Sequence, residues 1–266
     1  KALSNISHDQ GIKKMRRLGH SYEFDQIKNY VRGDDYRNIN WKASGRHNTL
    51  MVNQYEEERA QQIYCVLDKS RVMRMPFNGL SLLDYAINAT LALSNIALQK
   101  EDKAGLISFS DKIGTTLKAD RQAQQLHKIL NALYNESERQ TEANYELFFQ
   151  AAQKIIKGRS LVLLFTNFES EYALERVLPI LRKINASHLL VVVFFENTEI
   201  REFSKTEVTT LQAIYHQTTA QKFLSDKQTI SQSLRQYGIQ SILTKPEDLS
   251  INTINKYLEL KAKGVI

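Results

Sequence analysis

The sequence predicts an α/β fold, in which a mostly parallel sheet carries helices on both faces and a small β-containing appendage lies at the N-terminal end. From residue 61 onward, short apolar runs alternate with longer amphipathic segments, which is the order expected of strands and helices in such a sheet. The runs at 63–67 and 189–195 are uninterrupted, as is typical of strands covered on both faces. Glycine (10) and proline (3) are scarce among the 266 residues, so a turn-dense all-β chain is excluded.

The individual elements follow from these patterns. Strands are expected at 63–67, 104–109, 113–117, 161–165, 189–195 and 241–243. Helices are expected at 80–99, 121–134, 144–156, 171–184, 206–219, 225–237 and 248–261. The helix at 80–99 has apolar residues at three- and four-residue steps, and Ser81 with Asp84 three positions later resembles a weak capping box at its start.

Three segments differ in composition. Residues 61–266 carry the strand–helix alternation. Residues 21–60 are expected to form a β-containing appendage packed beside the main sheet, because 49–55 alternate like a strand and 32–47 are dense in charges and turn signals around Trp41, the only tryptophan. Residues 1–20 form a basic arm, since Lys13, Lys14, Arg16 and Arg17 cluster there.

The positive charge is uneven. The chain carries a net charge of +7, and residues 1–50 contribute +5 of it. The basic arm is interpreted either as a solvated segment or as the flank of a membrane span, because cytoplasmic flanks are rich in Lys and Arg. Nucleic-acid binding is disfavoured, since the main body has no basic stripe with interleaved aromatic residues.

Compartment and chain ends can also be addressed. No stretch reaches the ~18 uninterrupted apolar residues of a membrane-spanning helix, and no secretory signal is visible. The sequence begins at Lys1 and not at methionine, so we expect further residues upstream in the natural protein. The single cysteine, Cys65, excludes an intrachain disulfide and lies within an apolar run, so we expect a buried, inert thiol.

Polar residues at the ends of the predicted strands are the candidate ligand-binding residues, because open α/β sheets bind ligands at the carboxyl ends of their strands. Asp68 and Ser70 follow the strand at 63–67, Asn167 follows 161–165, and Glu196 with Asn197 follows 189–195. An Asp and a Ser two positions apart can offer oxygen ligands to Mg²⁺. An Asp at the end of a strand can equally be a turn former or helix cap, so both interpretations stay open.

Enzyme signatures are absent. The sequence has no G-x-x-x-x-G-K-[ST], no G-x-G-x-x-G and no G-x-S-x-G motif, which leaves neither a phosphate cradle nor a nucleophile elbow. The six histidines form no H-E-x-x-H pair. The sequence therefore favours a binding protein over an enzyme.

A family resemblance rests on residues 30–52 and 67–70. Residues 33–42 read Gly-Asp-Asp-x-Arg-x-Ile-x-Trp-Lys, and they are followed by Leu-Met-Val at 50–52 and Leu-Asp-Lys-Ser at 67–70. This order resembles the bacterial domain-of-unknown-function family fifty-eight, whose members are similar to von Willebrand factor A (vWA) domains and accompany MoxR-type AAA+ ATPases. The resemblance covers roughly residues 21–200.

The resemblance implies a vWA/Rossmann-like sheet with a metal-ion-dependent adhesion site of the form Asp-x-Ser-x-Ser, completed by a Thr and an Asp on later loops. Asp68 and Ser70 match this pattern. The departures are Val72 in place of the second Ser, Tyr145 or Asn144 in place of the Thr, and Asn167 in place of the late Asp. Because these changes remove a hydroxyl and a carboxylate, we expect Mg²⁺ to bind weakly or not at all.

The charged segment around Trp41 has two interpretations. It contains Arg32, Asp34, Asp35, Arg37, Lys42 and Arg46, with Gly33 at a turn. These side chains can form a rigid ion-pair network that docks the appendage on the sheet. Alternatively, the arginines and Trp41 belong to a protein-docking face, because both residue types are enriched at interface hot spots.

Taken together, these observations predict a non-enzymatic, vWA-like interaction domain that serves as adaptor for a MoxR-type AAA+ ATPase in assembling or remodelling an envelope or metal-containing complex. The resemblance further implies upstream membrane helices and a place on the cytoplasmic side of the inner membrane. Two alternatives remain. One is a Mg²⁺-dependent binder that holds an acidic partner side chain at Asp68 and Ser70, and the other is a hydrolase that uses Asp68.

Overall fold

The structure is a computed structural model that describes residues 22–57, 60–196, 200–201 and 211–265. The contacts within the chain divide it into two compact units, Lys1–Arg59 and Ala60–Ile266, each of which is described here by itself. The basic arm expected at residues 1–20 lies outside the described residues.

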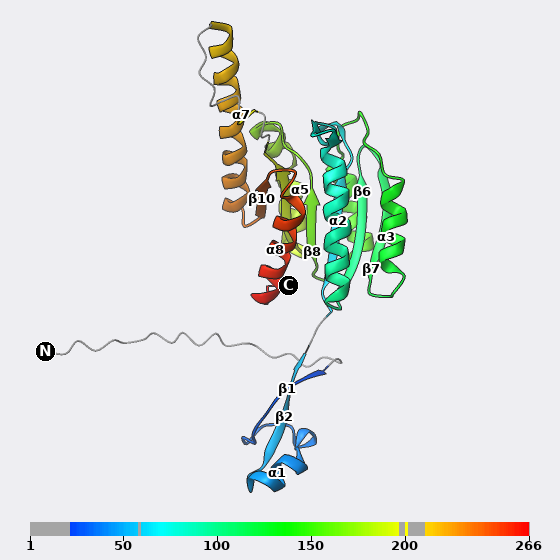
Figure 1. Cartoon of the computed structure of the whole chain (residues 1–266), viewed down its shortest axis with the longest axis vertical. Coiled ribbons are helices and arrows are strands. Elements are labelled where there is room, and N and C mark those ends of the chain that lie inside the picture. Colours follow the sequence, from blue (N-terminus) through cyan, green and yellow to red (C-terminus); the bar gives the residue numbers. More distant parts are fainter. Residues whose placement is uncertain (1–21, 58–59, 197–199, 202–210, 266) are drawn as a thin grey trace, which may run out of the picture. The chain divides into compact units, whose positions relative to one another are not determined.

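The first unit is a two-stranded hairpin with a short helix. Strands β1 (Tyr22–Asn29) and β2 (Met51–Glu57) pair antiparallel, and Val52 in β2 is buried. Between the two strands in the sequence come a 3-10 turn (Tyr36–Asn38) and helix α1 (Trp41–His47), and α1 lies at one end of the hairpin (Figure 1). The charges and turn signals at 32–47 predicted turns and no helix there. The helix forms because the Asn40 side chain accepts a hydrogen bond from the Ala43 N–H and caps its first turn.

The second unit is built on a six-stranded sheet in the order β10-β9-β8-β3-β6-β7. Its strands are β3 (Gln62–Asp68), β6 (Lys103–Phe109), β7 (Ile113–Asp120), β8 (Leu161–Phe165), β9 (Leu189–Phe195) and β10 (Gln240–Thr244). All neighbouring strands are parallel except β7, which pairs antiparallel with β6 at one edge. The predicted α/β fold with a mostly parallel sheet is confirmed.

Helices cover both faces of this sheet (Figure 1). On one face pack α2 (Leu82–Gln99), α3 (Gln125–Tyr134) and α8 (Leu249–Ala262), and on the other pack α4 (Tyr145–Ile155), α5 (Glu171–Ser187) and α7 (Leu211–Gln236). In the central strand β3, Ile63, Cys65 and Leu67 belong to the first core, while Tyr64 and Val66 belong to the second. The run from Ile63 to Leu67 in β3 is therefore uninterrupted by charged residues because both faces of the strand are covered.

Some element boundaries differ from the prediction. Helix α2 begins at Leu82, and both halves of the capping box between Ser81 and Asp84 are present; Leu80 and Ser81 instead form β5, which pairs with β4 (Pro76–Phe77). The prediction of two separate helices at 206–219 and 225–237 is wrong for the described residues, because α7 is one continuous helix from Leu211 to Gln236. Residues 220–224 contain neither Gly nor Pro, so nothing in the sequence breaks the helix there.

Cys65 lies in the middle of the central strand and is buried, as expected. Burial raises the pKa of its thiol to about 12. A thiolate is therefore suppressed at neutral pH, and the prediction of an inert thiol agrees with this position. Among the helices within the described residues, none is long and apolar enough to cross a membrane.

Candidate functional site

The carboxyl ends of β3 and β8 meet at a small pocket in the second unit. The pocket has a volume of about 70 Å³, room for a few water molecules. Its lining comes from the loops after β3 and β8 and from the starts of α4 and α5, and consists of Asp68, Ser70, Arg71, Val72, Glu142, Ala143, Tyr145, Asn167, Phe168, Ala173, Arg176 and Val177. Of the residues singled out at the strand ends, the structure thus brings together Asp68, Ser70 and Asn167, whereas Glu196 does not line this pocket and Asn197 lies outside the described residues.

Asp68 is fully buried, and protein donors surround its carboxylate. Its Oδ1 accepts a hydrogen bond from the Ser70 N–H at 2.9 Å, and its Oδ2 accepts one from Thr166 Oγ1 at 2.7 Å. The hydroxyl of Tyr145 lies 3.5 Å from Asp68 Oδ2 and 2.9 Å from Thr166 Oγ1. Because Thr166 uses its one hydrogen on Asp68, Tyr145 donates to Thr166, and the two hydroxyls form a chain that ends on the carboxylate.

This burial changes the protonation of the group. Burial raises the pKa of the Asp68 carboxyl above its ordinary value, and the donors around it, chiefly Ser70 and Thr166, lower it without cancelling the rise. Burial also raises the pKa of Tyr145, and the charge of Asp68 adds to that rise. Tyr145 therefore stays protonated and acts as a hydrogen-bond donor.

The other residue considered for this position, Asn144, has a different role. Its side-chain oxygen accepts a hydrogen bond from the Leu147 N–H and caps α4. The cap fixes the start of α4, so that Tyr145, the first residue of the helix, points at Asp68.

Ser70 supplies an unused polar group. The residue is 1% exposed, and its Oγ makes no well-formed hydrogen bond among the residues that the structure describes, although it lies near enough to Asp68 to lower the pKa of that carboxyl. A buried hydroxyl without a partner is destabilising, and such groups are rare in folded proteins. Since Ser70 lines the pocket, its hydroxyl is available to whatever enters there.

A buried lysine that the sequence analysis missed occupies the other side of Asn167. Lys227 of α7 is 2% exposed, and its Nζ donates to Asn167 Oδ1 and to the Phe168 carbonyl. Burial lowers the pKa of the Lys227 ammonium to about 7, against the charge of Glu169, which raises it. The oxygen of Asn167 is thus bound by a protein cation.

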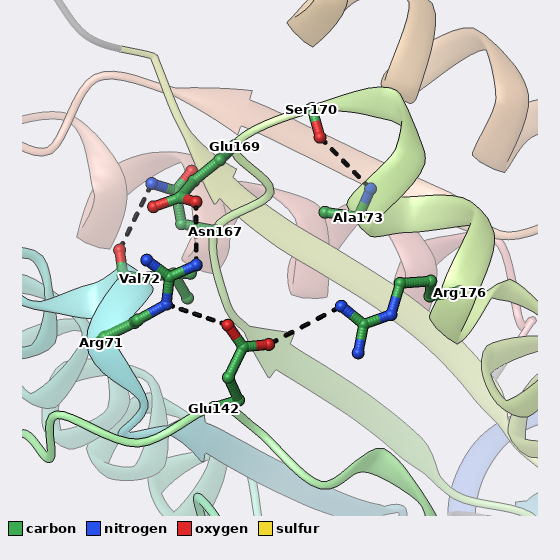
Figure 2. A network of polar contacts seen from close by, with 8 residues as sticks. All are labelled: Arg71, Val72, Glu142, Asn167, Glu169, Ser170, Ala173 and Arg176. Carbon is green, nitrogen blue, oxygen red and sulfur yellow. Dashed lines mark hydrogen bonds and ion pairs between the residues drawn. The ribbon is translucent and has the colours of Figure 1, made fainter.

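Four exposed charged side chains form the rim of the pocket (Figure 2). Glu142 lies between two arginines, with Oε1 at 3.0 Å from Arg71 Nε and Oε2 at 3.8 Å from Arg176 Nη1. Glu169 makes a second contact with Arg71, at 3.5 Å from its Nη2. The side chains of Arg71, Glu142 and Arg176 are 51%, 62% and 63% exposed, so each pair is solvated and weak.

The loop that carries Glu142 is anchored independently of that side chain. Its first part is held by Glu136, whose carboxylate binds Lys69 Nζ at 2.5 Å and accepts a hydrogen bond from Ser108 Oγ at 2.6 Å. Gly114 makes room for this cluster, because a Cβ there would collide with Ser108 Oγ and lie 2.9 Å from Lys69 Nζ. The cluster is buried, with side-chain exposures of 9% for Lys69 and 2% for Glu136.

Backbone hydrogen bonds hold the rest of this loop. The Arg139 N–H donates to the Lys69 carbonyl at 2.7 Å, and the Arg71 N–H donates to the Thr141 carbonyl at 3.0 Å. Two adjacent segments are thereby joined at the mouth of the pocket, and the position of the Glu142 backbone does not depend on its ion pairs.

The residues present do not fit the Mg²⁺ ion that the resemblance implies. Asp68 is the one buried carboxylate of the pocket, and both of its oxygens accept hydrogen bonds from the protein. Asn167 Oδ1 is bound by Lys227, and Val72 brings no oxygen from its side chain. No group of three or more His, Cys, Asp or Glu side chains within the described part of the chain could hold a metal. A divalent ion would need more oxygen ligands than remain.

Calorimetry can test this conclusion. We expect no saturable heat when Mg²⁺ is titrated to 1 mM into the chain, and we expect Asp68→Ala to give the same trace. Micromolar binding that disappears in Asp68→Ala would contradict the expectation and favour the Mg²⁺-dependent binder.

In the first unit, the predicted charged segment is at the surface of what the structure describes. Trp41 is 73% exposed and Tyr36 is 68% exposed. The basic side chains of the segment are likewise exposed, namely Arg32, Arg37, Lys42 and Arg46. The acidic residues have local roles: Asp34 pairs with Lys28 at 2.8 Å, and Asp35 caps the 3-10 turn by accepting from the Arg37 N–H. Trp41 is therefore not a core residue of its unit.

Comparison with known proteins identifies the family of the chain. Residues 26–217 match the family model described as "Protein of unknown function DUF58". The chain belongs to the DUF58 family. The match covers more than half of the sequence, and it confirms the resemblance inferred from the segments at 30–52 and 67–70. A search of curated proteins finds no match to the sequence of this DUF58 protein.

Solved structures agree on the fold. The conserved hypothetical protein BatB from Bacteroides thetaiotaomicron is 13% identical, with a TM-score of 0.50, over 76% of this DUF58 chain and 99% of that chain. The SpRpn10 VWA domain is 13% identical, with a TM-score of 0.45, over 72% of this chain and 93% of that one. At 13% identity the likeness to BatB shows the fold alone.

Proposed function

We propose that this DUF58 protein is a non-enzymatic, vWA-like interaction domain that acts as adaptor for a MoxR-type AAA+ ATPase in assembling or remodelling an envelope or metal-containing complex. The observation that carries the proposal is the exposure of Trp41, at 73%, among exposed basic side chains in the first unit. A tryptophan that is 73% exposed contributes little to the core of its own unit, and Trp and Arg are among the residues enriched at interface hot spots.

The surroundings of Trp41 support this assignment. Val31 is 63% exposed and Leu50 is 48% exposed, so the first unit exposes further apolar area besides the aromatic rings of Trp41 and Tyr36. The guanidinium of Arg37 lies 5.8 Å from the centre of the Tyr36 ring, a cation–π contact that orders both side chains. Apolar and aromatic side chains with arginines are typical of protein interfaces.

Burial argues against the hydrolase alternative. Asp68 has 0% exposure, and both of its oxygens are engaged by protein donors, so it does not present a nucleophile or base to a substrate. Cys65 is buried with a raised pKa. The membrane tether and the place on the cytoplasmic side of the inner membrane remain part of the proposal, supported by the basic residues at 13–17 and by the family resemblance.

Replacing Trp41 with alanine tests the docking face. We expect the thermal unfolding midpoint to stay unchanged, because the side chain is exposed, and the affinity for the purified MoxR-type ATPase to fall by about 30-fold, the effect of losing a hot spot of about 2 kcal/mol. Retention of the ATPase on the immobilised chain, with and without ATP, measures the effect.

Tyr134→Ala is the matched control, since Tyr134 is an 88% exposed aromatic residue in the second unit. It should leave both the midpoint and the retention unchanged. If the immobilised chain retains no ATPase under either nucleotide condition, the adaptor proposal is wrong.

A further inference from the structure

We propose that the pocket at the ends of β3 and β8 binds an acidic side chain of a partner protein directly through Arg71 and Arg176, without a metal ion, and that Glu142 fills this seat in the unbound chain. The site lies in the second unit and does not depend on the docking face around Trp41, so either proposal can fail alone.

The spacing of the two arginines already suits a carboxylate. Glu142 bridges them, with one oxygen at 3.0 Å from Arg71 Nε and the other at 3.8 Å from Arg176 Nη1 (Figure 2). Guanidinium groups bind carboxylates with well-defined geometry and need no cation between the two partners. An external carboxylate at the place of the Glu142 side chain would therefore meet the same donors.

Glu142 can leave the seat easily. Its side chain is 62% exposed, and exposed ion pairs of this kind contribute little to stability. The loop stays in place when the side chain turns away, because the Arg71 N–H donates to the Thr141 carbonyl and Asn144 caps α4. A partner would thus exchange one carboxylate for another without unfolding the rim.

The interior of the pocket supplies further donors. Ser70 Oγ is buried and makes no well-formed hydrogen bond among the described residues, so a carboxylate oxygen that enters the pocket competes only with the nearby Asp68 for its hydrogen. Asn167 Nδ2 makes only a long contact of 3.5 Å with the Val72 carbonyl and has a second hydrogen to donate. Ala173, in the first turn of α5, also lines the pocket, and the positive end of a helix dipole favours an anion.

Asp68 distinguishes this binding mode from a metal-dependent one. The charged groups around the pocket are Arg71, Arg176, Glu142, Glu169 and Asp68, with Lys227 behind Asn167, and an ionised Asp68 repels an incoming carboxylate. A metal would need Asp68 as a ligand. In the metal-free mode, removing its charge helps binding.

The test uses the peptide acetyl-Gly-Glu-Gly-amide, titrated in EDTA into the isotope-labelled 266-residue chain and followed by NMR. We expect saturable shifts at Ser70, Arg71 and Arg176 at millimolar peptide, and weaker shifts or none with the Gln peptide. Arg71→Gln combined with Arg176→Gln should weaken binding about tenfold or more. Glu142→Gln should strengthen it several-fold, because the internal competitor loses its charge.

Asp68→Asn decides between the two modes. It should keep or strengthen peptide binding in EDTA, whereas a metal-dependent site would lose it. Arg139→Gln is the matched control. Arg139 lies in the loop that carries Glu142 but pairs with Asp111 outside the pocket, so the replacement should leave peptide binding unchanged. Melting curves show that each variant is folded.

Three outcomes would overturn the proposal. Binding that requires Mg²⁺ and disappears in Asp68→Asn would assign a metal-dependent site. Equal binding of the Glu and Gln peptides would show that no carboxylate is recognised. Absence of saturable shifts in both the unchanged chain and Glu142→Gln, with the fold intact, would show that the seat takes no external ligand.

Discussion

Replacing Glu136 with glutamine is expected to lower the free energy of unfolding by about 3–5 kcal/mol, because it leaves the ammonium of Lys69 buried without a counter-charge. Lys69 Nζ and Glu136 are 2.5 Å apart, and the two side chains are 9% and 2% exposed. The loss of the charged acceptor for Ser108 Oγ adds to the effect. Urea denaturation followed by circular dichroism measures it.

The matched control is Glu259→Gln, which breaks ion pairs with Lys256 and Lys263 at the surface of α8. It should leave the unfolding midpoint close to that of the unchanged chain. If the two variants lose equal stability, the buried pair around Glu136 is not the anchor of the loop.

The Glu136 pair also has a pH signature. Burial raises the pKa of the Glu136 carboxyl, but the hydrogen bonds from Lys69 and Ser108 outweigh it and set the pKa below its ordinary value. A carboxyl with a lowered pKa in the folded state stabilises the fold above its unfolded pKa, and this contribution is lost as the pH falls through the folded pKa. We therefore expect the difference in the free energy of unfolding between the unchanged chain and Glu136→Gln to become smaller in acid.

Lys227→Met is expected to remove a pH dependence of stability that amounts to about 2–3 kcal/mol between pH 7 and pH 9. The pKa of Lys227 is about 7 in the folded chain, against an ordinary value of 10.5. Between these two values the unfolded state binds more protons, so stability rises with pH. Below pH 7 both states are protonated, and the full penalty of burying the charge is present.

The comparison is made by denaturation of both proteins across this pH range. Lys222→Met, which changes an exposed lysine on the same helix, should show the profile of the unchanged chain. A parallel pH profile for Lys227→Met and the unchanged chain would mean that the buried ammonium is not what titrates.

The sheet could be predicted because its strands lie under helices on both faces. Strands such as β3 and β9 read as continuous apolar runs, which polar alternation does not interrupt. The hairpin of the first unit lacks this signal. Strand β1 reads Tyr-Glu-Phe-Asp-Gln-Ile-Lys-Asn, with charges at alternate positions of its first half, and α1 owes its start to a single capping residue, Asn40.

The site could be predicted only where side chains come from the strand ends. Asp68, Ser70 and Asn167 were found because parallel strands end at one edge of a sheet. Thr166 adjoins Asn167 and could have been found by the same rule. Lys227 could not, because it reaches Asn167 from a helix 60 residues further along the chain, and nothing in the pattern of α7 marks it as buried.

The burial of Cys65 allows its reaction with a thiol reagent to report on unfolding of the second unit. Cys65 is the only cysteine of the sequence, and it is buried in the central strand of the sheet. It should therefore react with a thiol reagent only in molecules whose second unit has unfolded. The labelling rate in native buffer would then report how often the whole second unit unfolds, and no cysteine has to be introduced for the measurement. Variants that weaken the unit, such as Glu136→Gln, should label faster, whereas changes confined to the pocket rim should leave the rate alone.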